Sequence, residues 1–202
     1  MDFKDKVVLI TGASSGIGLA LALQALEEGA FVAVCARNCT SLIEANSKEI
    51  EEGRFLVMSV DVSDEIACKQ FIDAVINKWQ KIDVLINNAG ISMRSLLAET
   101  EISVLKELMN INFWGTVYCT KYALESIKAQ KGVIVGVSSI AGYRGLPGRT
   151  GYSASKFAMQ GFLESLRTEL LHTGAHVMWV SPGFTASNIR NVSRMGNGSV
   201  QG

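Results

Sequence analysis

Two residues that can exchange a proton, Tyr152 and Lys156, lie four positions apart. They open a helical pattern that runs to about Leu171. Positions i and i+4 share one face of a helix, so the phenol and the ammonium are expected side by side. The positive charge would favour the ionised phenol and lower its pKa from the ordinary ~10. Such a pair can work as an acid or a base, although the same spacing is also common in solvated surface pairs.

A glycine-rich turn near the N-terminus predicts a second kind of chemistry, the binding of a phosphate. The apolar run Lys6–Ile10 predicts a strand buried on both faces, and Thr11-Gly12-Ala-Ser-Ser-Gly16-Ile-Gly18 follows it. A helical pattern and a second apolar run come next. Glycines let a pyrophosphate approach the N-terminus of a helix, where free N–H groups favour anions. An isolated glycine turn would predict no more than a turn, but the strand, turn and helix together predict a phosphate site.

The elements that must position these residues alternate along the chain. Helices are expected over Leu42–Ile50, from the N-cap Ser63 to about Trp79, and over Ser103–Lys128. The alternation predicts a single α/β domain with a three-layer, doubly wound parallel sheet of Rossmann type. The expected strands are Lys6–Ile10, Phe31–Cys35, Phe55–Val60, Asp83–Ile86, Gly132–Val137 and Ala175–Val180.

Small and polar residues gather where these strands end. Ligands bind at the carboxyl ends of the strands in such sheets, so this edge is the expected site. The residues at the strand ends are Gly12, Asp61, Asn87, Ser139 and Pro182.

Composition limits the partners and the compartment. The 202 residues carry 19 basic and 19 acidic side chains, so no electrostatic attraction to nucleic acid is expected. The apolar run after the charged start is too short for a signal peptide or a membrane helix. The four cysteines show no metal-ligand spacing, so no metal site is expected. They are interpreted as reduced, mostly buried thiols of a cytoplasmic protein.

Taken together, these pieces resemble the short-chain dehydrogenase/reductase family over nearly the whole chain. From Met109–Gly115 through Phe162–Ser165 the chain is most similar to reductases of the dehydrogenase/reductase member 7B type. The pieces stand in the family's order: Thr11-Gly12-x3-Gly16-x-Gly18, Asp61-Val62, Asn87-Asn88-Ala89-Gly90, Asn112, Ser139, Tyr152-x3-Lys156 and Pro182-Gly183.

The resemblance implies four catalytic residues. Tyr152 would exchange a proton with the substrate oxygen, and Lys156 would lower its pKa and bond the nicotinamide ribose. Ser139, rather than its neighbour Ser138, would hold the substrate oxygen. Asn112 would kink its helix and hold a water that joins Lys156 to solvent. The alternative for Asn112 is a polar residue inside a helix that is satisfied by backbone groups.

The resemblance also implies the residues that hold a nicotinamide cofactor. Asp61 would accept from the adenine amino group, and Thr185 would contact the carboxamide. Asn87, Ala89 and Gly90 would line the cofactor, more through their backbone than through their side chains. The full expected set is Gly12, Ser14, Ser15, Gly16, Ile17, Gly18, Arg37, Asn38, Asp61, Val62, Asn88, Ala89, Gly90, Tyr152, Lys156, Pro182, Gly183 and Thr185.

The residues after the second strand predict which cofactor binds. An acid ~20 positions after the glycine turn reads the ribose of NAD. Here that segment is Cys35-Ala-Arg37-Asn38 and holds no acid. The planar fork of Arg37 suits a phosphate, and the Ser14 hydroxyl could add to it, so NADP(H) is expected over NAD(H). The alternative is that Arg37 is a solvated charge at a strand end.

The expected function is an NADP(H)-dependent oxidoreductase that moves a hydride between nicotinamide and a carbonyl or secondary alcohol. One alternative is a catalytically silent nucleotide-binding regulator or scaffold, which would have no need for all four catalytic residues. Another is a sugar-nucleotide epimerase or dehydratase, which this chain resembles less because those use a different glycine spacing. The loop residues Ile91, Met93, Leu96 and Leu97 suggest a hydrophobic small-molecule substrate.

Assembly and domain limits complete the expectation. Apolar residues beyond one inward stripe on Ser103–Lys128 and on the Tyr152 helix predict a homodimer or homotetramer. Residues 1–186 are expected to form the NADP-binding and catalytic domain. Residues 187–202 are rich in Asn, Gly and Ser and are expected to be a mobile tail at the start of a substrate-covering region. Family members usually continue past this point, so the remainder of that region is absent here.

Overall fold

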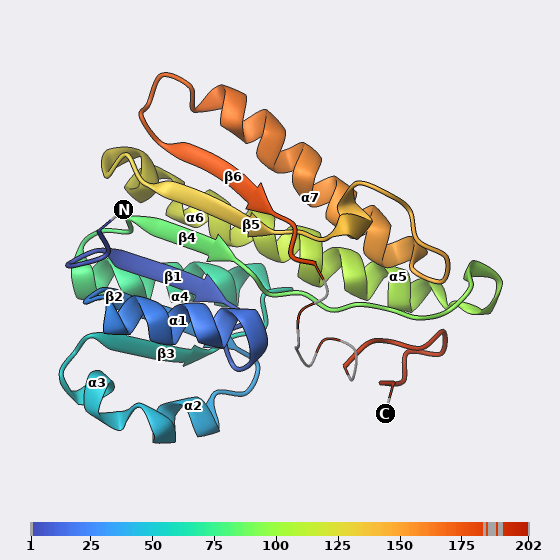
Figure 1. Cartoon of the computed structure of the whole chain (residues 1–202), viewed down its shortest axis with the longest axis horizontal. Helices are drawn as coiled ribbons and strands as arrows, with labels where there is room; N and C mark the ends of the chain where they lie inside the picture. Colours follow the sequence, from blue (N-terminus) through green and yellow to red (C-terminus); the bar gives the residue numbers. More distant parts are fainter. Residues whose placement is uncertain (1, 184, 186–188, 190–191, 202) are drawn as a thin grey trace.

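A computed structural model describes residues 2–183, 185, 189 and 192–201 of the chain. It contains one parallel sheet with the strand order β3-β2-β1-β4-β5-β6 (Figure 1). The chain adds strands on one side of β1 as far as β3, and then returns to the other side of β1 for β4, β5 and β6. This confirms the doubly wound parallel sheet and the single-domain α/β fold. The strands are β1 (Val7–Thr11), β2 (Phe31–Ala36), β3 (Phe55–Ser59), β4 (Val84–Asn87), β5 (Val133–Val137) and β6 (His176–Val180).

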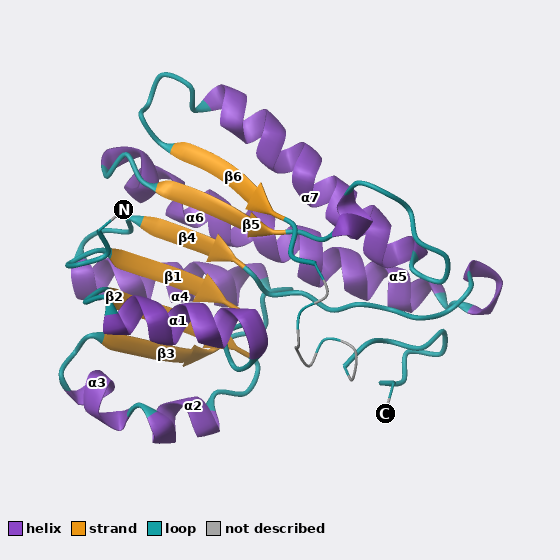
Figure 2. Cartoon of the chain, in the orientation of Figure 1, coloured by secondary structure: helices purple, strands orange, loops and turns teal. Residues whose placement is uncertain are grey.

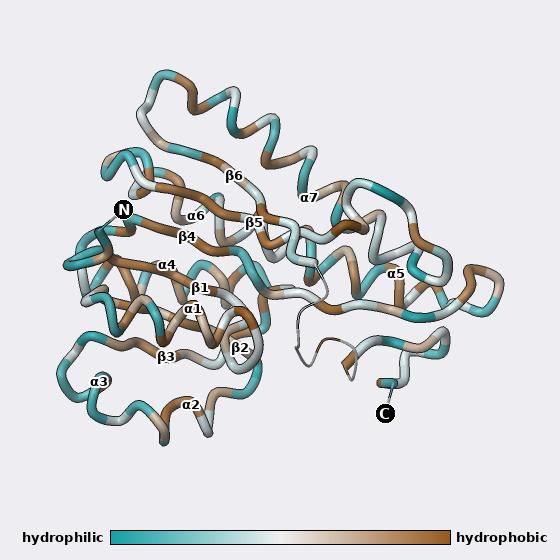
Figure 3. The backbone as a smooth tube through the Cα atoms, in the orientation of Figure 1, coloured by the Kyte–Doolittle hydropathy of each residue, from teal (hydrophilic) through white to brown (hydrophobic). Residues whose placement is uncertain are grey.

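Helices cover both faces of the sheet and give the fold three layers (Figure 2). Alternate residues of β1 point to opposite faces, so Val8 and Ile10 join one apolar core while Val7 and Leu9 join the other. The strands are therefore apolar along their length, which Figure 3 shows as brown segments inside a paler chain. The helices are α1 (Gly16–Glu27), α2 (Thr40–Ala45), α3 (Ser47–Glu51), α4 (Glu65–Trp79), α5 (Ile102–Met109), α6 (Gly115–Ala129) and α7 (Thr150–Glu169).

The long helix expected over Ser103–Lys128 is interrupted in its middle. A π-helical turn, η2 (Asn110–Trp114), joins α5 to α6 and contains the buried Asn112. Such turns are rare and occur frequently at functional sites. The start of α6 packs closely against the loop after β3, and Gly115 makes this possible. A Cβ atom on Gly115 would lie only 2.8 Å from Cγ2 of Val62.

Two other helices differ from expectation. The segment Leu42–Ile50 is divided between α2 and α3, because the side chain of Asn46 turns back and donates to the carbonyl of Leu42. The N-cap of α4 is Asp64 and not Ser63. The Asp64 carboxylate accepts from the first free N–H groups of the helix, whereas the Ser63 hydroxyl donates to Asp61 at 2.7 Å.

The segment expected as a mobile tail makes specific contacts where it is described. Arg194 pairs in β-bridges with Met93 and Val200. Its guanidinium donates to both carboxylate oxygens of Glu107 on α5, at 2.8 and 2.6 Å. Residues 192–201 therefore have defined contacts, and they turn back beside the loop that follows β4. The expected domain limit between 186 and 187 lies outside the described residues.

The short helical turns η1 (Leu97–Glu99) and η3 (Ile140–Gly142) complete the described elements. Among the described residues, no helix combines the length and the apolar character that a membrane span requires. The four cysteines are free and buried, as expected for reduced thiols.

Candidate active site

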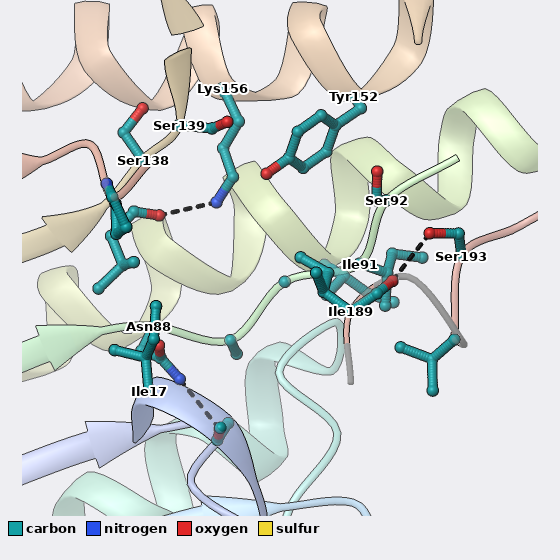
Figure 4. Close-up of a pocket in the computed structure, with 18 of the residues that line it drawn as sticks. Ile17, Asn88, Ile91, Ser92, Ser138, Ser139, Tyr152, Lys156, Ile189 and Ser193 are labelled. Atoms are coloured by element: carbon teal, nitrogen blue, oxygen red, sulfur yellow. Dashed lines mark hydrogen bonds between the residues drawn. The ribbon is translucent and has the colours of Figure 1, made fainter. Parts of the chain in front are cut away.

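A cleft of about 1040 Å³ lies at the carboxyl ends of the strands. Its wall is made by the glycine turn after β1, the loops after β2 to β6, and the start of α7 (Figure 4). The volume is at the upper end of the range for ligand pockets, which suits a large ligand or two ligands together. The sheet edge expected to carry the site therefore does carry a cleft.

The glycine turn is held by hydrogen bonds from the loop after β4. The side chain of Asn88 donates to the carbonyls of Thr11 and Gly12, both at 2.9 Å. Gly12 has a φ of +68°, and a Cβ atom there would lie 2.6 Å from Cα of Ala89, so no other residue fits this approach. The hydroxyl of Ser15, the N-cap of α1, makes no capping hydrogen bond within the described structure. The N–H groups at this helix end are available to an anion.

The loops after β2 and β3 form the next part of the wall. Arg37 and Asn38 line the cleft, and Arg37 is exposed with no ion pair within the described ranges. Asp61 is oriented by the backbone N–H and hydroxyl of Ser63, at 2.9 and 2.7 Å. The segment Cys35–Asn38 at the end of β2 holds no carboxylate, so an anion near Arg37 would meet a cation there.

The loop after β5 and the first turns of α7 bring Ser139, Tyr152 and Lys156 to one wall of the cleft (Figure 4). Nζ of Lys156 lies 5.9 Å from the centre of the Tyr152 ring. The shared helix face expected from the sequence is therefore present. Ser138 also lines the cleft, but its hydroxyl accepts from Nε2 of Gln160 at 2.7 Å, whereas Ser139 lies beside Tyr152.

The ionisation of the pair differs from the sequence expectation. Burial raises the pKa of Tyr152, while the Ser139 hydroxyl and the charge of Arg149 act in the opposite direction. Burial also lowers the pKa of Lys156 to about 8. The expected lowering of the phenol pKa by Lys156 is not found, because both groups are removed from water and the amine points to a backbone carbonyl instead. At neutral pH the phenol therefore holds its proton.

Asn112 lies behind the cleft and fastens two segments together. Its Oδ1 accepts from the backbone N–H of Ile91 at 2.8 Å, and its Nδ2 donates to the Ile91 carbonyl and to Oγ of Ser155, both at 2.9 Å. Ser155 in turn donates to the carbonyl of Tyr152. The side chain is thus fully bonded, to the backbone of Ile91 and to the hydroxyl of Ser155. The expectation that Asn112 holds a water beside Lys156 stays a prediction. A Cβ atom on Gly90 would lie 3.1 Å from Oδ1 of Asn112, so a glycine allows this approach.

Most of the expected cofactor residues line the cleft, with the following exceptions. Gly18 packs beneath the turn, where a Cβ atom would clash with the side chain of Asn88 and with the carbonyl of Gly12. Asn87 does not line the cleft, because its side chain points to α6 and donates to Thr120 at 3.0 Å. Those that line it are Gly12, Ser14, Ser15, Gly16, Ile17, Arg37, Asn38, Asp61, Val62, Asn88, Ala89, Gly90, Tyr152, Lys156, Pro182, Gly183 and Thr185.

The loop residues expected to contact a hydrophobic substrate are mostly elsewhere. Ile91 lines the cleft, but Met93 is fully buried in the core, and Leu96 and Leu97 are exposed outside the cleft. Their apolar character alone could not distinguish a pocket wall from a core position or a surface position.

Several lining residues were not predicted. The apolar ones include Ile140, Leu146, Ile189 and Val192, and the polar ones include Ser92, Tyr143, Arg149 and Ser193. For Arg149 the sequence did hold a signal, a cation three positions before Tyr152.

Comparison with known proteins agrees with this arrangement. The model of the family described as short chain dehydrogenase matches residues 6–197. The chain is 41% identical over 187 residues to 11-beta-hydroxysteroid dehydrogenase A of Arachis hypogaea, covering 91% of this chain and 53% of that protein. It is 40% identical over 195 residues to dehydrogenase/reductase SDR family member 7 of Mus musculus, covering 93% of this chain and 58% of that protein. The chain thus spans little more than half the length of these relatives.

Solved structures show the same fold. A short-chain dehydrogenase/reductase of Caenorhabditis elegans, solved with cofactor, superposes with a TM-score of 0.87 at 30% identity, over 95% of this chain and 74% of that one. One from Burkholderia phymatum in complex with NAD gives 0.86 at 26% identity, over 94% and 69%. An alcohol dehydrogenase of Thermococcus sibiricus complexed with 5-hydroxy-NADP gives 0.83 at 26% identity, over 89% and 77%.

Proposed function

The chain belongs to the short-chain dehydrogenase family, and on that premise we propose that it is an NADP(H)-dependent oxidoreductase acting on a carbonyl or secondary alcohol. The observation that carries the proposal is that Ser139, Tyr152 and Lys156 meet on one wall of a cleft whose other wall is the glycine turn. A proton donor thus lies in the same cleft as a place for a dinucleotide. A regulator or scaffold that had lost catalysis would have no chemical need for this group.

The residues of the chain fit a nicotinamide cofactor. Gly12 leaves room at the turn that a Cβ atom would fill, and the uncapped N-terminus of α1 suits a pyrophosphate. Asp61, on the far side of the cleft, is available to accept from the adenine amino group. When bound, the cofactor would supply or accept the hydride.

The side chains of the cleft would handle the substrate oxygen and its proton. Because burial keeps the Tyr152 phenol protonated at neutral pH, it would donate its proton to the carbonyl oxygen during reduction. In the reverse direction the deprotonated form of Tyr152 would take up the proton of the alcohol, and because burial raises the pKa of Tyr152 this form is reached only in the alkaline range. The Ser139 hydroxyl, beside Tyr152, would hold the substrate oxygen while charge develops on it. Lys156 would bond the nicotinamide ribose and exchange protons with Tyr152.

Arg37 supports the choice of NADP(H). An acid at the end of β2 would repel a 2′-phosphate, and the chain offers an exposed guanidinium in the cleft instead. The phosphate would gain a charge-assisted contact worth roughly 1.5–3 kcal/mol.

The substrate is proposed to be a largely hydrophobic small molecule. Ile91, Ile140, Leu146 and Ile189 line the cleft around the acid, and apolar walls favour an apolar ligand. The names of the hydroxysteroid dehydrogenase relatives agree with such a substrate. We further propose that the protein acts in the cytoplasm and assembles into a dimer or tetramer through α5, α6 and α7.

A direct assay tests the proposal. The full natural chain is incubated with NADPH or NADH and a broad set of ketones and aldehydes, and absorbance of the reduced nicotinamide is followed. Oxidation of NADPH that depends on a carbonyl compound is the expected result. Tight binding of NADPH without turnover of any compound, in either direction, would favour the regulator or scaffold.

A further inference from the structure

Arg149 is a charged wall residue of the cleft to which the proposed reaction assigns no task. It is the N-cap residue of α7, three positions before Tyr152, and its side chain is partly buried. One nitrogen of the guanidinium, Nη1, donates to the hydroxyl of Ser92. Ser92 is 2% exposed and belongs to the loop after β4, which Figure 4 shows approaching Tyr152. The guanidinium is thus held in place by a buried partner from a different part of the chain.

The charges of the cleft are unevenly distributed. The charged residues that line it within the described ranges are Arg37, Asp61, Arg149 and Lys156. Arg37 and Asp61 follow β2 and β3, at the end proposed for adenosine. Lys156 is bonded to the carbonyl of Val137. Arg149 is therefore the charge that remains on the side where the substrate oxygen must meet Tyr152.

The guanidinium has most of its hydrogen-bonding capacity left. An arginine carries five N–H donors, and the bond to Ser92 uses one of them. No aspartate or glutamate among the described residues forms an ion pair with Arg149. The apolar side chains of Ile140, Leu146 and Ile189 line the same cleft. A substrate that fills this space removes water from the cation, and an unpaired buried cation is costly unless the ligand supplies an anion.

We propose that Arg149 binds an anionic group of the substrate, and that the preferred substrates are oxo acids or hydroxy acids with a hydrophobic remainder. This rests on the proposed oxidoreductase function and names its substrate class. A carboxylate matches the planar fork of the guanidinium, and Ser92 fixes the orientation of that fork. The charge of Arg149 reaches the phenol of Tyr152, so the anion would lie close to the carbon that exchanges the hydride.

Matched pairs of charged and neutral ligands test the proposal. Benzoylformate and longer aryl and alkyl oxo acids are compared with their methyl esters, which keep the carbonyl and lose the charge. Dissociation constants are measured on the cofactor-loaded protein, and kcat/KM is measured in the same buffer. Each acid is expected to exceed its ester at least tenfold in both quantities, since a charge-assisted contact is worth ~10- to 100-fold. In Arg149→Gln this preference is expected to vanish.

Arg144→Gln is the matched control. Arg144 is an exposed cation in the same loop and does not line the cleft, so the acid preference is expected to survive its loss. Equal affinity of wild type for acid and ester overturns the proposal. So does an equal loss for acid and ester in Arg149→Gln together with a shifted pH profile, because Arg149 would then act on Tyr152 alone. If the esters are turned over and the acids are not preferred, the oxidoreductase function is supported and the anion site at Arg149 is contradicted. If the acids bind more tightly but no compound is turned over, the anion site is supported and the oxidoreductase function is contradicted.

Discussion

Nζ of Lys156 donates a hydrogen bond of 2.8 Å to the backbone carbonyl of Val137, the last residue of β5. This bond ties the helix that carries Tyr152 to the strand end that leads into Ser139. The lysine is 4% exposed, and burial lowers its pKa to about 8. Burying the charged amine of Lys156 removes its hydration and so destabilises the folded state. Groups with such a cost are common at functional sites, where they serve chemistry and not stability.

The first prediction follows from this cost. The folded pKa lies below the unfolded value of 10.5, so the unfolded chain binds more protons between about pH 8 and 10.5, and stability rises with pH there. Lys156→Met removes the cost and should raise the free energy of unfolding at pH 7 by about 1–3 kcal/mol, less at pH 10. The lost bond to Val137 offsets part of this gain.

Urea unfolding at both pH values measures the effect. Buried Cys35 and Cys119 have raised pKa values and act in the opposite sense at high pH, so the difference between wild type and variant is the quantity to compare. Lys121→Met, at an exposed position of α6, is the control and should change little. A gain that is the same at pH 7 and pH 10 would contradict the assignment of this pKa to Lys156.

The second prediction concerns proton transfer. Tyr152→Phe should lower kcat for carbonyl reduction by roughly 10²–10⁴, the range typical of a lost general acid. Its affinity for the cofactor should stay within about twofold of wild type, because the phenol acts on the substrate oxygen. Burial raises the pKa of Tyr152, so the wild-type rate should stay level through neutral pH and fall in the alkaline range. Steady-state rates and a cofactor titration decide it, and substantial residual turnover would remove Tyr152 as the acid.

The sequence predicted the sheet, and also the edge of it that carries the cleft, for a physical reason. Strands buried on both faces are apolar along their length, and the small and polar residues that interrupt this pattern mark the strand ends. The motif-based family assignment is confirmed by the match over residues 6–197, and the member 7 relatives of mouse and human support its finer placement. The roles of Ser139, Tyr152 and Lys156 came from that resemblance and stay predictions.

Features that depend on tertiary contacts were predicted only in part. The resemblance implied a kink at Asn112, but not the π-helical form of the turn at Asn110–Trp114 or the bonds from Asn112 to Ile91 and Ser155, which lie far away in the sequence. The helix spacing of Tyr152 and Lys156 was correct, but their pKa directions depend on burial, which spacing does not reveal.

The third prediction separates a structural from a catalytic role for Asn112. Asn112→Ala leaves the backbone N–H and carbonyl of Ile91 without partners in the interior, and unfolding free energy should fall by about 2–4 kcal/mol. Asn110→Ala, two positions earlier and exposed, is the control and should change stability by less than about 0.5 kcal/mol. Chemical denaturation measures both. Unchanged stability with lost activity in Asn112→Ala would show that the residue acts on the reaction and not on the framework.

The fourth prediction concerns cofactor choice. Wild type should bind NADPH at least tenfold more tightly than NADH, because Arg37 offers the 2′-phosphate a charge-assisted contact worth roughly 1.5–3 kcal/mol. Arg37→Ala should remove most of this margin and leave the affinity for NADH nearly unchanged. Fluorescence titration of both cofactors against both proteins gives the four constants. A preference that survives the substitution would show that Arg37 does not contact the phosphate.

The last prediction concerns assembly. Trp114 and Phe157 are 42% and 47% exposed on η2 and α7, and Phe113 packs edge-on against Phe162 with ring centres 6.3 Å apart. Aromatic side chains gathered at the junction of two packed helices form a surface that suits a second copy of the chain across a two-fold axis. Light scattering should give at least a dimer at micromolar concentration.

Replacing Trp114 or Phe157 by Glu should shift that assembly to the monomer, because each change places a charge in the apolar contact. The matched control is Ile43→Glu on α2. Ile43 is 44% exposed, close to the exposure of Trp114, and lies on a helix whose buried Leu42 belongs to the other apolar core of the sheet. A surface change of this kind should leave the dimer intact. The prediction would be contradicted if wild type is a monomer, or if all three variants dissociate equally. Either result would show that Trp114 and Phe157 do not lie in a contact between copies.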